Sequence, residues 1–175
     1  IVHKEEERYK SEIVGGTLDI SIGKLIDRVG VEMGLSFPAG KYVDELSNQS
    51  VLTKIPKTPI AVKDGYFNLS GIETKLIRMI EKKEFINPDI SIILLDNITR
   101  TLGSAISNMI DNLKIKKVLM VGGVASNSYL RDNLISNING ECQLVFSSQA
   151  LSTDNSCGIA LLGKDKYISR GVNCE

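Results

Sequence analysis

A short apolar strand that ends in two glycines and leads into a helix constrains this chain more than any other feature. Residues Val118–Val121 are all apolar, and Gly122 and Gly123 follow directly. A helical pattern, a second strand at Gln143–Phe146 and a final apolar helix come next. This order favours two neighbouring parallel strands joined by a right-handed crossover. We therefore expect an α/β fold with a βαβα part at about 116–170.

The preceding residues, about 17–115, have mainly helical patterns. The clearest begins at Asn87, as the cap, and Pro88, and apolar residues then recur every three or four positions to Leu113. This spacing predicts a long amphipathic helix that packs across a sheet. The remaining expected elements are helices from an N-cap at Thr17 to Gly34, at residues 41–47 and from Ser70, and strands at Tyr9–Val14 and Tyr66–Leu69.

The composition disfavours several classes of function. Lys and Arg together number 21, as do Asp and Glu, so tight, purely electrostatic binding of nucleic acid is not expected, although a local basic face stays open. The single histidine, His3, lies in a charged stretch, which disfavours a catalytic triad and excludes a histidine-rich metal site. Cys142, Cys157 and Cys174 are far apart, as in a reduced, cytoplasmic protein. No apolar run reaches the roughly 18 residues that span a membrane, so no membrane partner is expected.

The pair Gly122 and Gly123 is the first candidate binding site. A strand that ends in two residues without Cβ atoms lets a ligand approach the backbone closely, and a following helix N-terminus favours an anion. Neither the dinucleotide fingerprint nor a phosphate-binding loop motif is present, so a plain tight turn remains an alternative. Asn127 opens the next helix, either as its cap or as an amide that contacts the same ligand.

Acidic residues form the second group of candidates. Asp19, Asp27 and Asp44 fall in the first two helical patterns, where each is either a solvated surface charge or part of a site. Gly40 would leave room for a ligand beside them. Asp154 follows the second strand of the βαβα part, where it either caps the last helix or holds a metal ion.

Five blocks in this order resemble the tRNA threonylcarbamoyladenosine synthase family, long known as the glycoprotease family. The family's segments are G-E-T-L-D-D-A-A-G-E-A-F-D-K, G-L-x-Y-P-G-G, F-S-F-S-G-L-K-T, A-G-G-V-x-A-N and C-T-D-N. The corresponding residues here are Gly15–Arg28, Gly34–Gly40, Tyr66–Thr74, Val121–Asn127 and Ser152–Asn155. The resemblance therefore covers about residues 9–163.

The resemblance implies a lobe of an actin-like ATPase (ribonuclease H-like) fold with inserted helices. It also implies transfer of a threonylcarbamoyl group from threonylcarbamoyl-AMP to N6 of the adenosine beside a tRNA anticodon. Its implied partners are tRNA and the other proteins of threonylcarbamoyladenosine synthesis, and its implied nucleotide ligand is threonylcarbamoyl-AMP or ATP. By position, Asp27, Gly40 and Asp44 match residues that hold the adenylate's ribose and base side. Gly122, Gly123 and Asn127 match nucleotide contacts, and Asp154 matches the family's metal-binding aspartate.

The chain also departs from the family pattern. The family's H-x-x-x-H metal motif and S-G-G-H-T loop are absent, so residues 1–175 are expected to be the C-terminal lobe without its N-terminal lobe. Such a chain is expected to be inactive alone, to self-associate, and to lack the iron or zinc of the full-length protein. Gly16, Ile20, Lys24 and Ser152 replace Glu, Asp, Glu and Cys of the family, as in a diverged paralogue.

Three other functions remain open from the sequence. The first is a non-catalytic, actin-like paralogue that holds a complex together. The second is a metalloendopeptidase, which the absence of H-E-x-x-H disfavours. The third is a generic nucleotide-binding domain of the sugar-kinase type.

Overall fold

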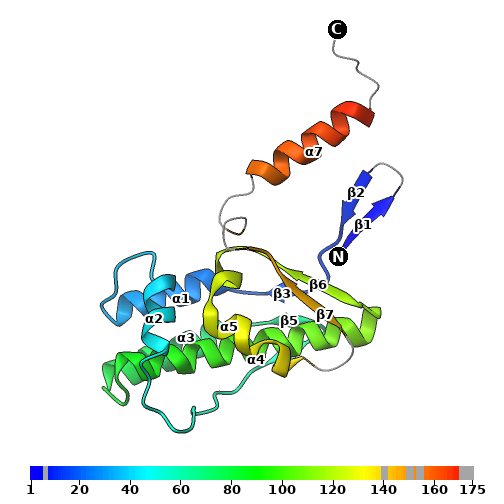
Figure 1. Cartoon of the computed structure of the whole chain (residues 1–175). Coiled ribbons are helices and arrows are strands. Elements are labelled where there is room, and N and C mark those ends of the chain that lie inside the picture. The colour runs from blue at the N-terminus through cyan, green and yellow to red at the C-terminus, as the bar shows by residue number, and fades with distance from the viewer. Residues whose placement is uncertain (6–7, 139–141, 149–151, 153–155, 170–175) are drawn as a thin grey trace.

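Helix α4 (Asn87–Leu113) runs through the middle of the fold and supplies much of its buried apolar surface (Figure 1). The computed structural model describes residues 1–5, 8–138, 142–148, 152 and 156–169 of the chain. Ile90, Ile93, Leu94 and Ile98 of α4 are almost completely buried. Their three- and four-residue spacing is that of the predicted amphipathic helix, which is confirmed.

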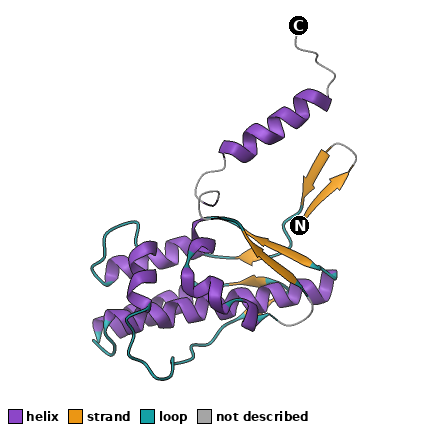
Figure 2. Ribbon diagram, in the orientation of Figure 1, coloured by secondary structure: helices purple, strands orange, loops and turns teal. Residues whose placement is uncertain are grey.

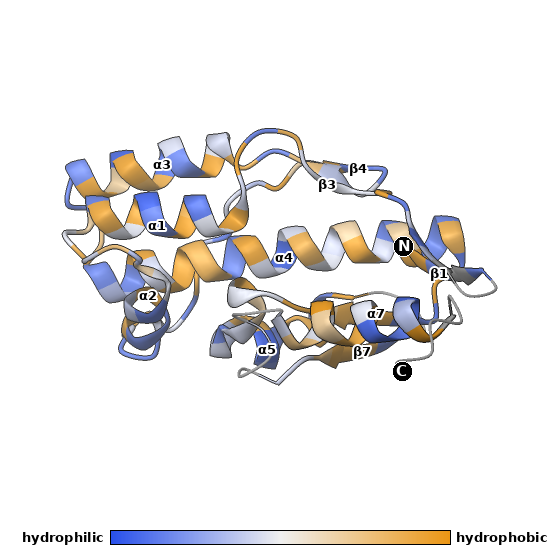
Figure 3. Cartoon of the chain, turned by 90° about the horizontal axis from the view of Figure 1, so that it is seen from above, coloured by the Kyte–Doolittle hydropathy of each residue, from blue (hydrophilic) through white to orange (hydrophobic). Residues whose placement is uncertain are grey.

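The three helices that precede α4 in the chain all pack on it, and the first of them also contacts the other two. They are α1 (Ile22–Glu32), α2 (Gly40–Ser47) and α3 (Ser70–Glu81). Figure 3 shows α1 and α3 on one side of α4 and the α5 region on the other, so α4 lies between two layers. The helices predicted at 41–47 and from Ser70 are confirmed, the first beginning one residue earlier, at Gly40.

Short strands make up three small sheets (Figure 2). The strands are β1 (Val2–Glu5), β2 (Arg8–Ser11), β3 (Gly16–Thr17), β4 (Val62–Lys63), β5 (Tyr66–Phe67), β6 (Lys117–Met120) and β7 (Gln143–Phe146). β1 and β2 form an antiparallel hairpin. β5 pairs in parallel with β3 and antiparallel with β4.

Strands β6 and β7 are parallel, as the sequence order predicts, with Lys117 opposite Gln143. The connection holds three short elements rather than one helix: η1 (Gly123–Ser126), α5 (Ser128–Asn133) and η2 (Ile135–Asn137). Leu130 and Leu134 of this connection are buried in the core beside α4. The mixed α/β fold expected from the sequence is therefore observed.

Polar contacts fix the loop that precedes β4 to the middle of α4. The buried Thr58 accepts a hydrogen bond at its hydroxyl from Asn97 Nδ2 (2.6 Å) and at its carbonyl from both terminal nitrogens of Arg100 (3.0 Å each). Arg100 Nε also donates to Asp96 at 2.7 Å. These contacts hold a segment without helix or strand in one place.

A glycine in α4 sets the distance to the second layer. A Cβ atom at Gly103 would collide with the backbone carbonyl of Asn137 in η2. Only glycine therefore allows α4 to approach η2 as closely as it does. This contact joins the middle of α4 to the crossover between β6 and β7.

Two segments project from this body in Figure 1: the β1–β2 hairpin and helix α7 (Ser156–Ser169). Several apolar side chains of α7 are exposed, among them Ile159, Leu161 and Ile168. No helix in the described part of the chain combines the length and apolar character needed to cross a membrane.

Two predicted helix caps are wrong. Thr17 lies in β3, and α1 is capped instead by Ser21, whose hydroxyl accepts from Lys24 N at 3.3 Å. Asn87 lies inside α4 rather than at its cap, and its Nδ2 donates to the carbonyl of Met33 at 3.0 Å. In the second case a contact distant in sequence replaces the local one that the pattern predicted.

Candidate functional site

The first predicted site residue, Asp27, joins α1 to the start of α2. Its Oδ1 accepts a hydrogen bond from Ala39 N at 2.8 Å, directly before Gly40. No described group lies within hydrogen-bond distance of Oδ2, and Asp27 is only half-buried. A Cβ atom at Gly40 would meet no other atom within 4 Å. The two residues therefore border open space, with one carboxylate oxygen available to a ligand.

Asp44 joins α2 to α5. It lies on α2, one turn after Gly40, and its carboxylate binds the first residue of α5. Ser128 N donates to Oδ2 at 2.9 Å and Ser128 Oγ donates to Oδ1 at 2.8 Å. Through these two hydrogen bonds the carboxylate holds α2 and α5 together. It also satisfies an amide that a free helix N-terminus would offer to an anion.

Asn127 caps α5, and its side-chain amide nitrogen is still available. Its Oδ1 accepts from Leu130 N at 2.9 Å, as an N-cap residue does. The residue is 8% exposed, and no described group accepts a hydrogen bond from its Nδ2. Asn127 can therefore fill both predicted roles, since Oδ1 caps the helix and Nδ2 is left to contact a ligand.

Gly122 and Gly123 differ from each other. Gly122 has φ 96° and ψ 168°, a conformation that nearly always requires glycine. Gly123 is the first residue of η1, is exposed, and a Cβ atom there would meet nothing within 4 Å. The backbone conformation of the turn therefore explains by itself why residue 122 is glycine. Folding alone does not require glycine at position 123, because a Cβ atom there would enter open space.

A chain of contacts joins all six of these predicted residues. It runs from Asp27 to the start of α2, from Asp44 on α2 to Ser128, and from Asn127 back through η1 to Gly122. In addition, α1 contacts η1 and α2 contacts α5. Residues up to about 100 positions apart in the sequence thus meet at one junction of α1, α2 and η1.

Asp19 lies outside this junction. Its carboxylate accepts hydrogen bonds from the backbone amides of Ile20, Leu69 and Ser70 at 2.7–2.9 Å. Desolvation opposes ionisation of this group, but the three amides outweigh it and hold the pKa of Asp19 well below its usual range. Asp19 is therefore an exposed charge, as expected for a surface residue, but its three hydrogen bonds also fix the start of α3.

The predicted metal ligand, Asp154, lies outside the described residues. Within the described ranges, no three His, Cys, Asp or Glu side chains form a group that fits a metal ion. The nearby Ser152 is described: its hydroxyl bonds the hydroxyl of Ser147 and the carbonyl of Ser148. The metal therefore remains a prediction.

Two residues with important contacts were not predicted. Arg131 Nε donates to the carbonyl of Ala125 in η1 at 2.7 Å, and Arg131 Nη2 donates to the carbonyl of Ser147 at 2.8 Å. Its guanidinium also lies 5.0 Å from the ring centre of Phe146. Arg131 therefore ties the diglycine turn to the segment after β7. The second residue is Ser128, whose only sequence signal is its place one residue after a helix cap.

Tyr129 adds a further tie between α5 and α4. Burial raises the pKa of its hydroxyl, and the neighbouring Asp96 carboxylate raises it further. The phenol therefore stays neutral at physiological pH. Asp96 thus lies near Tyr129 and also binds Arg100.

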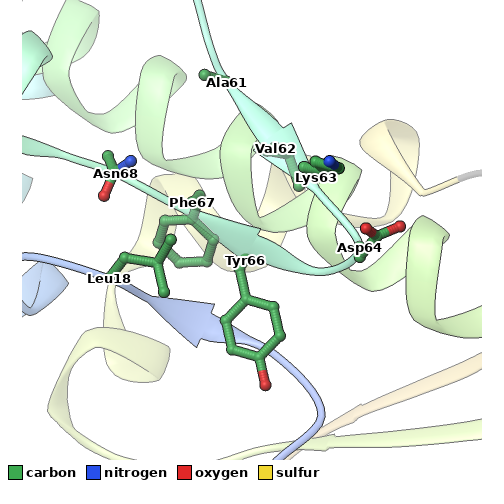
Figure 4. Close-up of a pocket in the computed structure, with 8 residues that line it drawn as sticks. All are labelled: Leu18, Ala61, Val62, Lys63, Asp64, Tyr66, Phe67 and Asn68. Atoms are coloured by element: carbon green, nitrogen blue, oxygen red, sulfur yellow. The ribbon is translucent and has the colours of Figure 1, made fainter.

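Two surface cavities lie elsewhere, next to β4 and β5. The larger, of about 670 Å³, is lined mainly by Leu18, Val62, Phe67 and the ring of Tyr66 (Figure 4). The smaller, of about 370 Å³, lies between the Thr58 loop, α3 and α4. None of the predicted site residues lines either cavity.

Comparison with known proteins gives consistent matches. A family model described as tRNA N6-adenosine threonylcarbamoyltransferase (TsaD) matches residues 2–161. The protein of that name from Thermotoga neapolitana is 30% identical over 173 residues, covering 97% of this chain and 53% of the relative. Its counterpart from Clostridium perfringens strain SM101 is 31% identical over 179 residues, covering 95% and 50%. The chain thus spans about half the length of the curated relatives it matches.

One solved structure shares the fold. The crystal structure of T. kodakarensis HypF superposes with a TM-score of 0.69, covering 85% of this chain and 20% of that one. At 13% sequence identity, the likeness shows a common fold and no common activity.

Proposed function

Since this chain belongs to the tRNA N6-adenosine threonylcarbamoyltransferase family, we propose that it forms the nucleotide-binding C-terminal lobe of such an enzyme. The whole enzyme would transfer a threonylcarbamoyl group from threonylcarbamoyl-AMP to N6 of an adenosine beside a tRNA anticodon. The lobe would have the actin-like ATPase fold, and a second lobe would complete the cleft. Its partners would be tRNA and the other proteins that make this nucleoside, and the isolated chain would not complete the reaction.

The junction of α1, α2 and η1 carries this proposal. Asp27 retains a free carboxylate oxygen, which would accept hydrogen bonds from the ribose hydroxyls. Gly40 leaves space beside it for the nucleoside. Asn127 Nδ2 would donate a hydrogen bond to the ribose-phosphate of the ligand, and the open space beside Gly123 would admit that ribose-phosphate.

Asp44 has a double role in this proposal. Both of its oxygens bind Ser128, so it first keeps the α2 side of the site in place against the η1 side. A carboxylate oxygen has two lone pairs, and the one left on Oδ2 would face the nucleoside.

Catalysis by this lobe would consist of positioning. The adenosine N6 attacks the carbamoyl carbon, a C–N bond forms, the bond from that carbon to the phosphate oxygen breaks, and AMP leaves while N6 loses a proton. Holding the adenylate at a fixed place converts the attack into an effectively unimolecular step. No side chain of the described residues is assigned to the proton transfer.

A second function, that of a non-catalytic partner, also has support. Gly16, Ile20 and Lys24 replace acidic residues of the family motif. Ser128 N and Leu130 N, which open α5, are already bound by Asp44 and Asn127. On this alternative the same junction only stabilises the lobe, and the lobe holds a complex together.

Calorimetric titration of the chain with a non-hydrolysable threonylcarbamoyl-AMP analogue distinguishes the two. Asp27→Asn keeps an oxygen for Ala39 N and removes the charge, and Asp27→Ala removes both. If Asp27 binds the ribose, the affinity should fall about 10- to 100-fold in both variants, because a charge-assisted hydrogen bond contributes roughly 1.5–3 kcal/mol.

Asp132→Asn is the matched control, since Asp132 is exposed and lies on α5. It should leave the affinity unchanged. Thermal melts of each variant separate loss of binding from loss of fold. A wild-type chain that binds no analogue, or equal affinities for wild type and Asp27→Asn, would contradict the nucleotide-binding proposal and favour the non-catalytic partner.

A further inference from the structure

The two cavities beside β4 and β5 adjoin each other and share Ala61 and Asn68. Together they make one open groove, which we name the β4–α3 groove after the elements that border it. Its floor is apolar: Leu18 and Phe67 lie side by side in Figure 4, next to the ring of Tyr66. Side chains that donate or accept hydrogen bonds also line it, namely the exposed Asn68 and the buried Asn97.

The groove is bordered by lysines. Lys63 lines the larger cavity and Lys75 lines the smaller one. Lys57 precedes Thr58, which also lines the smaller cavity. Among the described residues, none of these three ammonium groups lies within ion-pair distance of a carboxylate. Two exposed cations without a carboxylate partner among the described residues, Lys63 and Lys75, therefore line the groove, and a third, Lys57, directly precedes a lining residue.

Acidic groups do little to offset this charge. Residues 48–63 contain three lysines and neither Asp nor Glu. Glu73 on α3 is bound by Arg28, at 3.1 Å between Nη1 and Oε1. Asp64, at the turn between β4 and β5, is the one carboxylate among the residues that line the two cavities. The groove is therefore a local basic face on a chain whose formal net charge is zero.

The backbone that carries the three lysines is held in place. Thr58 is held by Asn97 and Arg100 of α4, so Lys57 extends from an anchored point of the loop. Lys63 lies on β4, and Lys75 lies on α3. Because the backbone is held at all three positions, a ligand that bridges the lysines would not have to order it.

We infer that the β4–α3 groove binds a single-stranded segment of RNA. Its phosphates would lie against Lys57, Lys63 and Lys75, and one base would rest on the floor of Leu18 and Phe67 beside the Tyr66 ring. Cations along a groove with an aromatic side chain are the features by which proteins bind single strands. The inference rests on the proposed function, in which the RNA is the tRNA substrate, and it places that RNA away from the nucleotide junction.

Fluorescence anisotropy with a labelled, unstructured RNA of about 12 nucleotides tests this on the 175-residue chain. Three phosphate contacts predict a slope of about −2 for log affinity against log salt concentration. The triple variant Lys57→Gln, Lys63→Gln, Lys75→Gln should lose at least tenfold in affinity and most of that slope. The control variant Lys10→Gln, Lys41→Gln, Lys82→Gln removes three salt-bridged lysines elsewhere and should bind within about twofold of wild type.

The aromatic contact has its own pair of variants. Tyr66→Leu should weaken binding about five- to tenfold without changing the salt slope, and Tyr66→Phe should keep wild-type affinity because stacking needs only the ring. If Tyr66→Leu unfolds the chain, Lys63→Gln alone still tests the groove, since its side chain is exposed.

Three results would overturn the inference. Equal losses in the two triple variants would mean a general charge effect. A wild-type chain that does not bind the RNA would leave the groove without this ligand. A polyglutamate peptide that binds the groove as tightly as the RNA would identify it as a docking surface for an acidic protein. None of these results changes the titration of the Asp27 variants, so the proposed function stands or falls separately.

Discussion

Asp44 on α2 accepts hydrogen bonds from both the backbone amide and the hydroxyl of Ser128, which lies 84 residues later at the start of α5. This pair joins α2 to the crossover between β6 and β7. It also places Gly40 and Asn127, which neighbour the two partners, beside the same junction.

Removing the Asp44 carboxylate should therefore destabilise the chain. We expect Asp44→Ala to lower the free energy of unfolding by about 1.5–3 kcal/mol, since charge-assisted hydrogen bonds are lost. Urea denaturation of Asp44→Ala, Ser128→Ala and the double variant should give a coupling energy of about 1 kcal/mol. Glu45→Ala, one residue away and exposed, should change stability by less than about 0.5 kcal/mol. Additive effects of Asp44→Ala and Ser128→Ala would show that the pair contributes nothing.

The Asp19 carboxylate should make stability depend on pH. Its pKa is depressed in the folded chain, so its contribution is complete above the unfolded value of about 3.9 and is lost as pH falls through the folded value. Asp19→Asn should cost about 1 kcal/mol at pH 7, the usual effect of losing a helix cap. The difference from wild type should shrink below about pH 4. Urea midpoints at pH 7, 5, 4 and 3 test this, and a constant difference would contradict it.

Replacing each of the two glycines in the turn that follows β6 (the β6 turn) by alanine should affect stability differently. Gly122→Ala should cost about 1–3 kcal/mol of stability, because its φ of 96° is strained for any other residue. Gly123→Ala should leave stability within about 0.5 kcal/mol, since its Cβ would enter open space. Titration of Gly123→Ala with the adenylate analogue then distinguishes a plain turn from a binding loop. Lower affinity at unchanged stability supports binding, and unchanged affinity supports the turn alone.

Arg131 should not be replaceable by lysine. Its two hydrogen bonds to the carbonyls of Ala125 and Ser147 require a forked, planar donor. We expect Arg131→Lys to lower the free energy of unfolding by about 1–3 kcal/mol. Arg78→Lys is the matched control, because Arg78 is exposed on α3 and should tolerate the change. Similar urea midpoints for the two variants would refute the bracing role of Arg131.

The exposed apolar residues of α7 should promote self-association. Ile159, Leu161 and Ile168 are each more than 60% exposed, and exposed apolar surface drives association. Light scattering at roughly 10–100 µM should give an average mass above the 19.2 kDa of one chain. The double variant Leu161→Gln, Ile168→Gln should lower this mass, whereas Lys164→Gln should not. A monomer at every concentration would contradict the expectation.

The parallel pair β6 and β7 could be predicted because its signals are local. An apolar run, two glycines, a helix and a second strand follow one another within about 30 residues, and the handedness rule for crossovers supplies the pairing. The long α4 was equally clear, because its apolar period continues from the proline at its start to Leu113.

Other features of the fold depend on contacts between segments that are distant in the sequence, and a local sequence pattern cannot predict such contacts. Asp19 binds amides about 50 residues away at the start of α3, while Thr17 lies in β3 and not at a helix cap. Strand β1 was missed because its sequence, Val-His-Lys-Glu, lacks strand-forming character and its partner β2 supplies the hydrogen bonds. Among the site residues, the aspartates were identified by resemblance, whereas Arg131 and Ser128 became visible only through their partners.

Helix α4 fixes the relative positions of both regions discussed above. Asn97 holds the loop of the β4–α3 groove, Gly103 sits against Asn137, and Met109 lies against the Gly65 turn between β4 and β5. These anchor points follow one another about six residues apart, or roughly 9 Å along the axis. Because α4 is held at these three positions, it cannot slide or rotate at one of them without moving at the other two. The β4–α3 groove and the β6 turn should therefore move as one rigid unit in any conformational change that displaces either of them.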